Sequence, residues 1–346
     1  MAKFIVKRLA LGVLTILAIS FVMSVFNTIV PDHPYDGLIR GTKGDPVRIA
    51  AIRARFGADD PFYLQYFKFV GNITQPVWNW IDWTNLWHGG GVHFQAPGAP
   101  ELGYSIPEHN EVWQSITSRA GATFQLMLSS YIVTLLIAVP VGIISAVRQY
   151  SKLDNAVTSL SFVGISLPNY WFGTLLIYAF AIFPVAHGFH EIFPTGKQHV
   201  TGDTSFSDLL WHLVLPVAVL AVQSIASYAR FIRASMLEVL NQDYIRTARA
   251  KGLANPRVVI RHAFRNSLLP FITLLGLDIP QLFVGAVITE FVFNWPGMGQ
   301  FFVNSASAND FPSLIGIALL LSVFVVVGNL IADLAYTWAD PRISYG

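Results

Sequence analysis

The sequence predicts an all-α polytopic membrane protein with six transmembrane helices, both termini inside, and a large extracytoplasmic segment between helices 1 and 2. Of its 346 residues, 53% are hydrophobic and only 12% are charged, whereas a soluble domain carries about 25% charged residues. Apolar runs long enough to cross a hydrocarbon core of about 30 Å recur along the chain. They lie at 9–30, 122–147, 157–183, 209–229, 268–290 and 312–337.

The first expected span follows three basic residues, Lys3, Lys7 and Arg8. A charged start before an apolar run is also typical of signal peptides. Here the run is too long for one, and no small-x-small cleavage site follows it. Residues 1–30 are therefore expected to form an N-terminal segment with a retained first helix.

The distribution of Lys and Arg sets the expected orientation, because short cytoplasmic loops carry an excess of positive charge. With the N-terminus inside, the four cytoplasmic pieces hold most of the basic residues, and the short outer loops after helix 2 hold only Lys197. These pieces are 1–8, 148–156, 230–267 and 338–346. An even number of spans then places both termini inside.

The extracytoplasmic segment 31–121 is expected to be structured. Asp45 and Pro46 supply a cap and a first-turn proline for a helix that Gly57 ends, and a second helix starts after Asp60–Pro61. A Trp-rich insertion over 73–101 follows. Its indoles fit either an aromatic belt at the outer interface or a platform for a partner or substrate.

Residues 122–337 are expected to form a five-helix core that includes a cytoplasmic loop at 236–270, and 338–346 form a cytoplasmic tail. The segment Asp243–Pro270 is called the basic loop below. A helix over 236–251 is predicted to end near Gly252, because glycine tolerates positive φ. Asn255 is predicted to cap a second helix with Pro256 in its first turn.

The charge of the basic loop needs no special function, since cytoplasmic loops are basic in any case. Arg257, Arg261 and Arg265 recur every four residues and share one helix face. Topology does not explain the helix–Gly–helix organisation or the polar cluster 262–266 at a membrane entry. Nucleic-acid binding is disfavoured, because the chain has a net charge of only +2 and a span flanks the loop on each side.

Several chemistries are excluded or disfavoured. The chain has no Cys, which excludes disulfides and thiolate ligands. It contains no GxxxxGK[ST] phosphate loop, nucleophile motif or paired carboxylates, so it is not expected to be an enzyme. His187, His190 and Glu191 form HxxHE rather than HExxH, and an outer-loop polar cluster is preferred to a metal site.

Asp278 lies near the middle of the fifth expected span, where an ionisable residue is a functional candidate by default. One interpretation puts it on a translocation path, facing a cationic group such as a peptide amino terminus. The other is a structural hydrogen bond to a neighbouring helix. Gln223 in the fourth span is a second candidate for the same path.

The most specific pattern lies in the basic loop. The residues that carry it are Asp243, Tyr244, Arg246, Thr247, Ala248, Arg249, Ala250, Lys251, Gly252, Leu253, Val258, His262, Ala263, Arg265, Asn266 and Pro270. They resemble the EAA loop of membrane subunits of binding-protein-dependent ABC importers, in the version of the dipeptide, oligopeptide and nickel class. The turn 294–299 and the closing Asp340–Pro341–Arg342 are similar to the same class. The Trp-rich insertion is longer than the class norm.

The resemblance implies a permease subunit that moves di- or oligopeptides, or a related small solute, by alternating access. Its partners would be a second homologous permease subunit, two cytoplasmic ABC ATPases and an extracytoplasmic solute-binding protein. ATP and Mg would bind the ATPases, with no cofactor on this chain, in the cytoplasmic (inner) membrane of a prokaryote. The ATPase-coupling residues would be Tyr244, Arg246, Thr247, Ala248, Arg249, Ala250, Lys251, Gly252, Leu253, His262, Arg265 and Asn266.

Three alternatives stay open. A nickel-chelate or oligosaccharide importer would use a subunit of the same type. A secondary transporter is disfavoured because the sequence shows no internal repeat. A membrane-embedded enzyme would have to use Asp278 and nearby polar residues.

Overall fold

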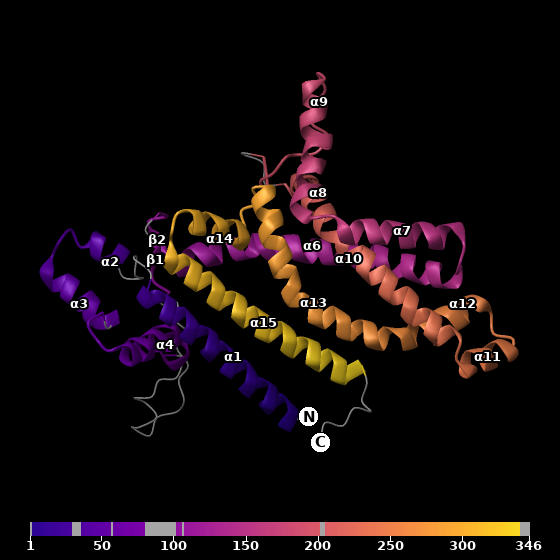
Figure 1. Ribbon diagram of the computed structural model, residues 1–346, viewed down its shortest axis with the longest axis horizontal. Coiled ribbons are helices and arrows are strands. Elements are labelled where there is room, and N and C mark those ends of the chain that lie inside the picture. The colour runs from indigo at the N-terminus through magenta and orange to yellow at the C-terminus, as the bar shows by residue number, and fades with distance from the viewer. Residues whose placement is uncertain are drawn as a thin grey trace. The chain divides into compact units, whose positions relative to one another are not determined.

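The computed structural model describes residues 2–29, 36–56, 58–79, 102–105, 107–200 and 205–339. These residues are almost entirely helical (Figure 1), which confirms the all-α class. They divide into two compact units, one built from 121–300 and 327–346, the other from 2–120 and 301–326. The predicted division at 30, 121 and 337 stays a prediction.

The first unit contains most of the expected permease core. Its elements are α6 (Val112–Val147, from residue 121), α7 (Lys152–Ser166), α8 (Asn169–Ile177), the π-helical η1 (Tyr178–Ile182), α9 (Phe183–Ala186), α10 (Phe206–Leu240), α11 (Asp243–Ala250), α12 (Asn255–Arg257), the π-helical η2 (Val258–Phe264) and α13 (Arg265–Val292). Helix α10 packs against α7, α8 and α13. It also meets α6 closely at Gly142, where an added Cβ would lie 2.8 Å from the Ala229 carbonyl oxygen. Small residues at such crossings allow helix backbones to approach within a membrane.

The second unit combines the N-terminal elements with the later part of the chain. It holds α1 (Ala2–Ile29), α2 (Asp36–Gly41), α3 (Pro46–Phe56), α4 (Phe62–Asn79), the hairpin of β1 (Tyr104–Ser105) and β2 (Asn110–Glu111), most of α14 (Met298–Ser307) and the start of α15 (Phe311–Ala339). The strands are antiparallel, with Tyr104 opposite Glu111. The Ser105 hydroxyl donates to Asp310 Oδ2 at 2.6 Å and so fastens the hairpin to the start of α15.

The two helices predicted after Asp45 and Asp60 are present as α3 and α4. The Asp45 carboxylate accepts a hydrogen bond from the Val47 amide at 3.0 Å, as an N-terminal cap should. Gly57, the predicted end of α3, lies outside the described residues. So does most of the Trp-rich insertion, from 80 to 101.

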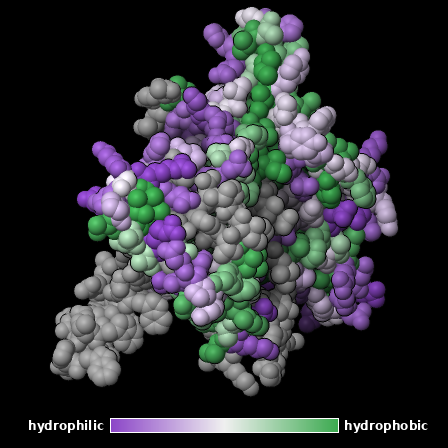
Figure 2. Space-filling view, turned by 60° about the vertical axis from the view of Figure 1, so that its left-hand side comes forward, coloured by the Kyte–Doolittle hydropathy of each residue, from purple (hydrophilic) through white to green (hydrophobic). Residues whose placement is uncertain are grey.

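Five helices in the described residues are long and apolar enough to cross a membrane. They are Val6–Val25, Val112–Val147, Asn169–Ala186, Phe206–Leu240 and Phe311–Ile331. The remaining expected span, 268–290, falls within α13, several of whose side chains lie outside the described residues. Large apolar side chains such as Leu136 and Leu160 stay exposed, and apolar residues reach the face drawn in Figure 2. Such a surface suits lipid better than water.

The prediction of one continuous helix over 157–183 is wrong. Helix α7 ends at Ser166, Leu167 is extended with ψ 121°, and Pro168 is the N-cap of α8. Proline disfavours the helical conformation of the residue before it, which explains the break. The apolar span of this region begins at Asn169 rather than at 157.

Candidate functional site

The first arm of the basic loop is the short helix α11, which is separate from α10. Helix α10 ends at Leu240 and α11 begins at Asp243, so the predicted single helix over 236–251 is wrong. Within α11 only Ile245 and Ala248 are buried. The helix therefore lays one narrow apolar side on the protein and presents its other sides outward.

The turn after α11 is fixed by glycine. Gly252 has φ +78°, a left-handed conformation that costs non-glycine residues energy. Its amide donates to the Arg249 carbonyl at 2.9 Å, and the Leu253 amide donates to the Ala248 carbonyl at 3.4 Å. This pair of bonds is a Schellman motif, and the sharp turn predicted at Gly252 is confirmed.

The second arm differs from its prediction in two ways. Its N-cap is Ala254 rather than Asn255, with Pro256 in the first turn as expected. Helix α12 then winds directly into the π-helical η2 and on into α13 without a break. Arg257, Arg261 and Arg265 are exposed, whereas Val258, Val259 and Ala263 are buried. The predicted division between a basic face and an apolar face is confirmed.

The structure joins the two arms through Asn266. Its side-chain amide donates to the Tyr244 hydroxyl at 3.0 Å and to the His262 carbonyl at 2.8 Å. The sequence pattern contained all three residues but gave no sign of this contact. The bridge holds the arms in one arrangement, so the loop is a preformed shape rather than a flexible linker.

Most predicted coupling residues line the outer surface of this loop. The exposed ones are Tyr244, Arg246, Thr247, Arg249, Ala250, Lys251, Gly252, Leu253, Arg265 and Asn266, and His262 is half-buried. Arg246 pairs with Asp243 at 3.4 Å, and both side chains are largely exposed. A pair of this kind contributes little stability and remains available to a partner.

Ala248 requires a correction. It was expected to face an ATPase groove, but its side chain packs inward against a core that contains Ile232 and Met236 of α10 and Ala146 of α6. Because alanine is small, α11 can pack closely against the permease core. Ala250 is exposed and keeps its predicted place on the outer surface.

A second cluster lies among the helices. Asp278 of α13 is partly buried and faces Tyr131 of α6 and Tyr228 of α10. The Tyr228 ring meets Phe271 of α13 edge-on at 5.5 Å. Three helices therefore bring polar groups to one place. Gln223 is engaged elsewhere, since its amide donates to the Ile165 carbonyl at 3.4 Å.

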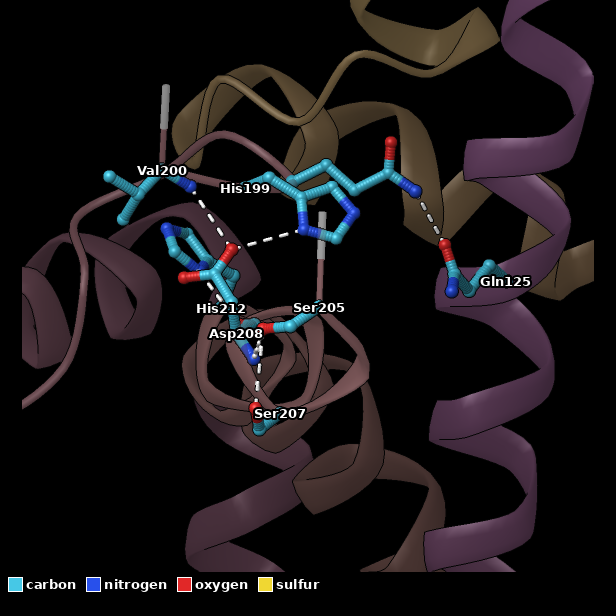
Figure 3. A network of polar contacts seen from close by, with 8 residues as sticks. Gln125, His199, Val200, Ser205, Ser207, Asp208 and His212 are labelled. Carbon is cyan, nitrogen blue, oxygen red and sulfur yellow. Dashed lines mark hydrogen bonds and ion pairs between the residues drawn. The ribbon is translucent and has the colours of Figure 1, made fainter. Parts of the chain in front are cut away.

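A polar network joins the start of α10 to α6 (Figure 3). Asp208 Oδ2 accepts from the Val200 amide at 3.1 Å and lies 3.0 Å from His199 Nδ1. His212 Nδ1 lies 2.9 Å from the Asp208 carbonyl oxygen. The Gln198 amide donates to Gln125 of α6 at 2.6 Å. These contacts hold residues 198–200 between Gln125 of α6 and the start of α10.

The turn between α13 and α14 is held by Glu290. Its side chain is fully buried, and Oε2 accepts from the amides of Gly299 at 2.7 Å and Gln300 at 3.2 Å. An added Cβ at Gly297 would lie 2.3 Å from the carboxyl carbon. The chain turns back here, and the carboxylate caps the start of α14.

Comparison with known proteins now places the chain. Residues 138–345 match the family described as "Binding-protein-dependent transport system inner membrane component", and residues 1–127 match the N-terminal region of such membrane components. The chain belongs to this family. It is an inner membrane permease component of a binding-protein-dependent transport system, as the basic loop predicted.

The relatives of this permease component align over their whole length. It is 39% identical to the oligopeptide transport system permease protein AppB of Bacillus subtilis, covering 100% of both chains. It is 32% identical to the dipeptide transport system permease protein DppB of Escherichia coli, covering 100% of this chain and 99% of that one. A chain of the MetNI methionine ABC transporter is 15% identical with a TM-score of 0.49, covering 64% of this chain and 96% of that one.

Sequence reasoning also missed an ion pair in this permease component. Asp154 of α7 is buried and paired with Arg233 of α10. In the sequence, Asp154 reads as an ordinary first-turn residue behind the N-cap Ser151, and Arg233 as one more topological charge. The available signal was an Asp beside a membrane entry with no basic residue near enough in sequence to pair with it on its own helix.

The HxxHE segment shows no metal-site geometry in the described residues. His187 Nδ1 lies 2.8 Å from the Phe183 carbonyl oxygen, and its ring stacks on Phe183 at 4.1 Å. The imidazole is thus engaged with its own helix.

Proposed function

We propose that this chain is a permease subunit of an ATP-driven importer that moves di- or oligopeptides across the cytoplasmic membrane by alternating access. The observation that carries the proposal is the basic loop, a preformed helix–turn–helix with an outward polar surface and an apolar underside seated on α10. Because α12 and η2 run on into α13, a force applied to the loop reaches membrane helices on both sides. The peptide cargo is favoured by the names of the full-length relatives.

The proposed complex has six transmembrane helices in this chain with both termini inside, and the basic loop in the cytoplasm. A second homologous permease subunit completes the pathway. Two cytoplasmic ATPases bind ATP and Mg and dock on the exposed residues of the basic loop. An extracytoplasmic binding protein delivers the solute, and this chain hydrolyses no ATP itself.

Uptake by a reconstituted system tests this function. Liposomes would hold the chain, its second permease and both ATPases, with binding protein outside, ATP inside and radiolabelled trialanine as the probe. We expect uptake only when ATP, ATPases and binding protein are all present. Uptake by the chain alone along an ion gradient would instead indicate a secondary transporter. ATP-dependent uptake of a nickel chelate or an oligosaccharide, without peptide uptake, would select the alternative cargo.

Asp278 of α13 is proposed to lie on the translocation path, with the exposed Gln223 of α10 as a second contact. Its described neighbours are phenols, which leave the carboxylate able to attract a cation, and a peptide in water carries an ammonium group at its amino end. Asp278→Asn should lower uptake of free trialanine by about tenfold, the scale of a lost charged hydrogen bond, and affect N-acetyl-trialanine much less. Equal losses for the two peptides would assign Asp278 a structural role.

A further inference from the structure

The carboxylate of Asp154 is enclosed by donors from several parts of the chain. Arg233 approaches it with two parallel contacts, Nε to Oδ1 at 2.5 Å and Nη2 to Oδ2 at 2.7 Å. The Ser145 hydroxyl also donates to Oδ1, and the Tyr150 amide donates to Oδ2 at 2.9 Å. Only 1% of the Asp154 side chain is exposed. Bidentate contacts of this kind fix direction as well as distance.

These donors join three helices at one end of the first unit. Ser145 lies in the last turn of α6, Tyr150 in the connection to α7, and Arg233 in α10. The Ser151 hydroxyl caps α7 by accepting a hydrogen bond from the Asp154 amide at 3.2 Å. Helix α7 runs alongside α10 (Figure 1). The carboxylate therefore fixes the ends of α6 and α7 to one point on α10.

That point on α10 also carries the basic loop. Ile232 and Met236 flank Arg233 in sequence, and both belong to the buried core that includes Ile245 and Ala248 of α11. The α10 segment that holds the ion pair therefore also holds the underside of the loop. A displacement of α11 is therefore passed to this segment of α10, which the ion pair joins to α7.

We propose that Asp154 and Arg233 are positioning residues that make the ends of α6, α7 and α10 move as one body with the basic loop. The inference rests on the proposed role of that loop in receiving ATPase motion. Without the ion pair, α7 would be held by apolar contacts that tolerate sliding, and part of the ATPase stroke would be lost as local deformation. The break at Pro168 gives this body a natural boundary, since α7 stops there and α8 begins.

Transport per ATP hydrolysed is the first readout. Asp154→Asn keeps the shape and one acceptor but removes the charge that aligns Arg233. In the reconstituted complex we expect normal ATPase binding and ATP hydrolysis, with trialanine uptake per ATP lowered about tenfold, within the usual range of coupling between sites. Arg233→Lys keeps the charge without the bidentate contact, so its uptake per ATP should lie between the values of the parent and of Asp154→Asn.

The matched control is Arg230→Gln. Arg230 lies one turn earlier on α10, is exposed, and rests over the Phe162 ring of α7 at 5.3 Å. The Arg230→Gln variant removes one charge from the same helix pair, of the opposite sign to that of Asp154, and leaves the buried carboxylate enclosed. Uptake per ATP should stay at the parent value. A loss equal to that of Asp154→Asn would show that general charge, rather than the enclosed pair, matters.

A distance measurement tests the rigid body without any substrate. The chain has no Cys, so spin labels on Lys152→Cys in α7 and Gln242→Cys beside α11 report one distance. In the parent complex this distance should be the same with and without trapped ATP. In Asp154→Asn the label distance should broaden, or shift between the states with and without trapped ATP. If Asp154→Asn folds poorly, the same measurement is made on Arg233→Lys. An unchanged, narrow distance in both variants would overturn the proposal.

The two hypotheses fail differently. If the parent complex shows no ATP-dependent uptake, the proposed function is wrong, whatever the label distances are. If the parent transports normally and Asp154→Asn keeps both its label distance and its uptake per ATP, only the positioning role is wrong.

Discussion

At the residue scale, two buried carboxylates are stabilised by different donors. Asp154 is neutralised by an arginine, whereas Glu290 accepts backbone amides at the start of α14. A buried carboxylate needs either a counter-charge or several hydrogen bonds. The sequence located neither, because both depend on chain reversals that bring separate segments together. It did locate Gly252, because a turn with positive φ directly favours glycine.

Glu290→Ala should destabilise the protein by about 1–3 kcal/mol, because it leaves the buried amides of Gly299 and Gln300 without an acceptor. Glu290→Gln keeps one oxygen and should cost less. The thermal midpoint in detergent measures both. Glu238→Ala, at an exposed site on α10, is the control and should leave the midpoint unchanged. Equal midpoints for Glu290→Ala and the parent would refute the capping role.

The Asp154–Arg233 pair should show no pH dependence in the neutral range. The hydrogen-bonded Arg233 guanidinium, with Ser145 and the Tyr150 amide, holds the pKa of the Asp154 carboxyl well below its usual range. A depressed folded-state pKa adds stability that is complete above the unfolded value of about 3.9 and lost as pH falls toward the folded value. The stability difference between the parent and Asp154→Asn should thus be constant from about pH 5 to pH 8. Denaturation at several pH values checks this, and a difference that shrinks above pH 5 would contradict it.

At the element scale, the structure follows the sequence where a helix boundary has a local cause. Asp45 sets a cap and Gly252 sets a turn by their own chemistry, and both were predicted from sequence. The break between α10 and α11 and the π-helical η2 were not, since apolar and polar residues there keep a helical spacing. In both cases the packing of Ile245, Val258 and Ala263 into one core selects the observed winding.

Gly252→Trp should abolish ATP-driven uptake while the protein still inserts into the membrane. A bulky residue at φ +78° is strained, and the surroundings of Gly252 are open, so the indole would project from the docking surface. Gly188→Trp is the matched control, because Gly188 has φ +80° with similarly open surroundings but lies in another loop. It should insert and transport. Normal uptake by Gly252→Trp would remove the loop from ATPase coupling.

At the scale of the whole molecule, the described surface carries apolar and charged side chains that the chain itself does not cover. Its described helices leave large apolar side chains exposed, which suits contact with lipid, and its basic loop leaves charged side chains exposed. The sequence predicted the family from residues on that exposed surface, because the residues of the basic loop follow a local motif. It did not predict the internal polar clusters, whose members come from separate helices.

Binding of the ATPase subunits to the chain should weaken as salt rises. The exposed Arg246, Arg249 and Arg265 would pair with acidic groups in the ATPase groove, and ionic strength screens exposed pairs. Titration of labelled ATPase onto the reconstituted chain at low and high salt measures the effect. The triple Arg→Gln variant should bind more weakly and lose most of the salt dependence. An unchanged salt dependence in that variant would assign these side chains to lipid headgroups instead.

The bond between Ser105 and Asp310 has a consequence for biogenesis. Its partners are 205 residues apart in sequence, yet they belong to one compact unit. At a synthesis rate of about 5–20 residues per second, the hairpin would wait roughly 10–40 s for its partner to leave the ribosome. During that interval the N-terminal helices are already made but unfinished, open to quality-control proteases and chaperones. The hairpin can therefore complete its contact with α15 only after Asp310 has been translated.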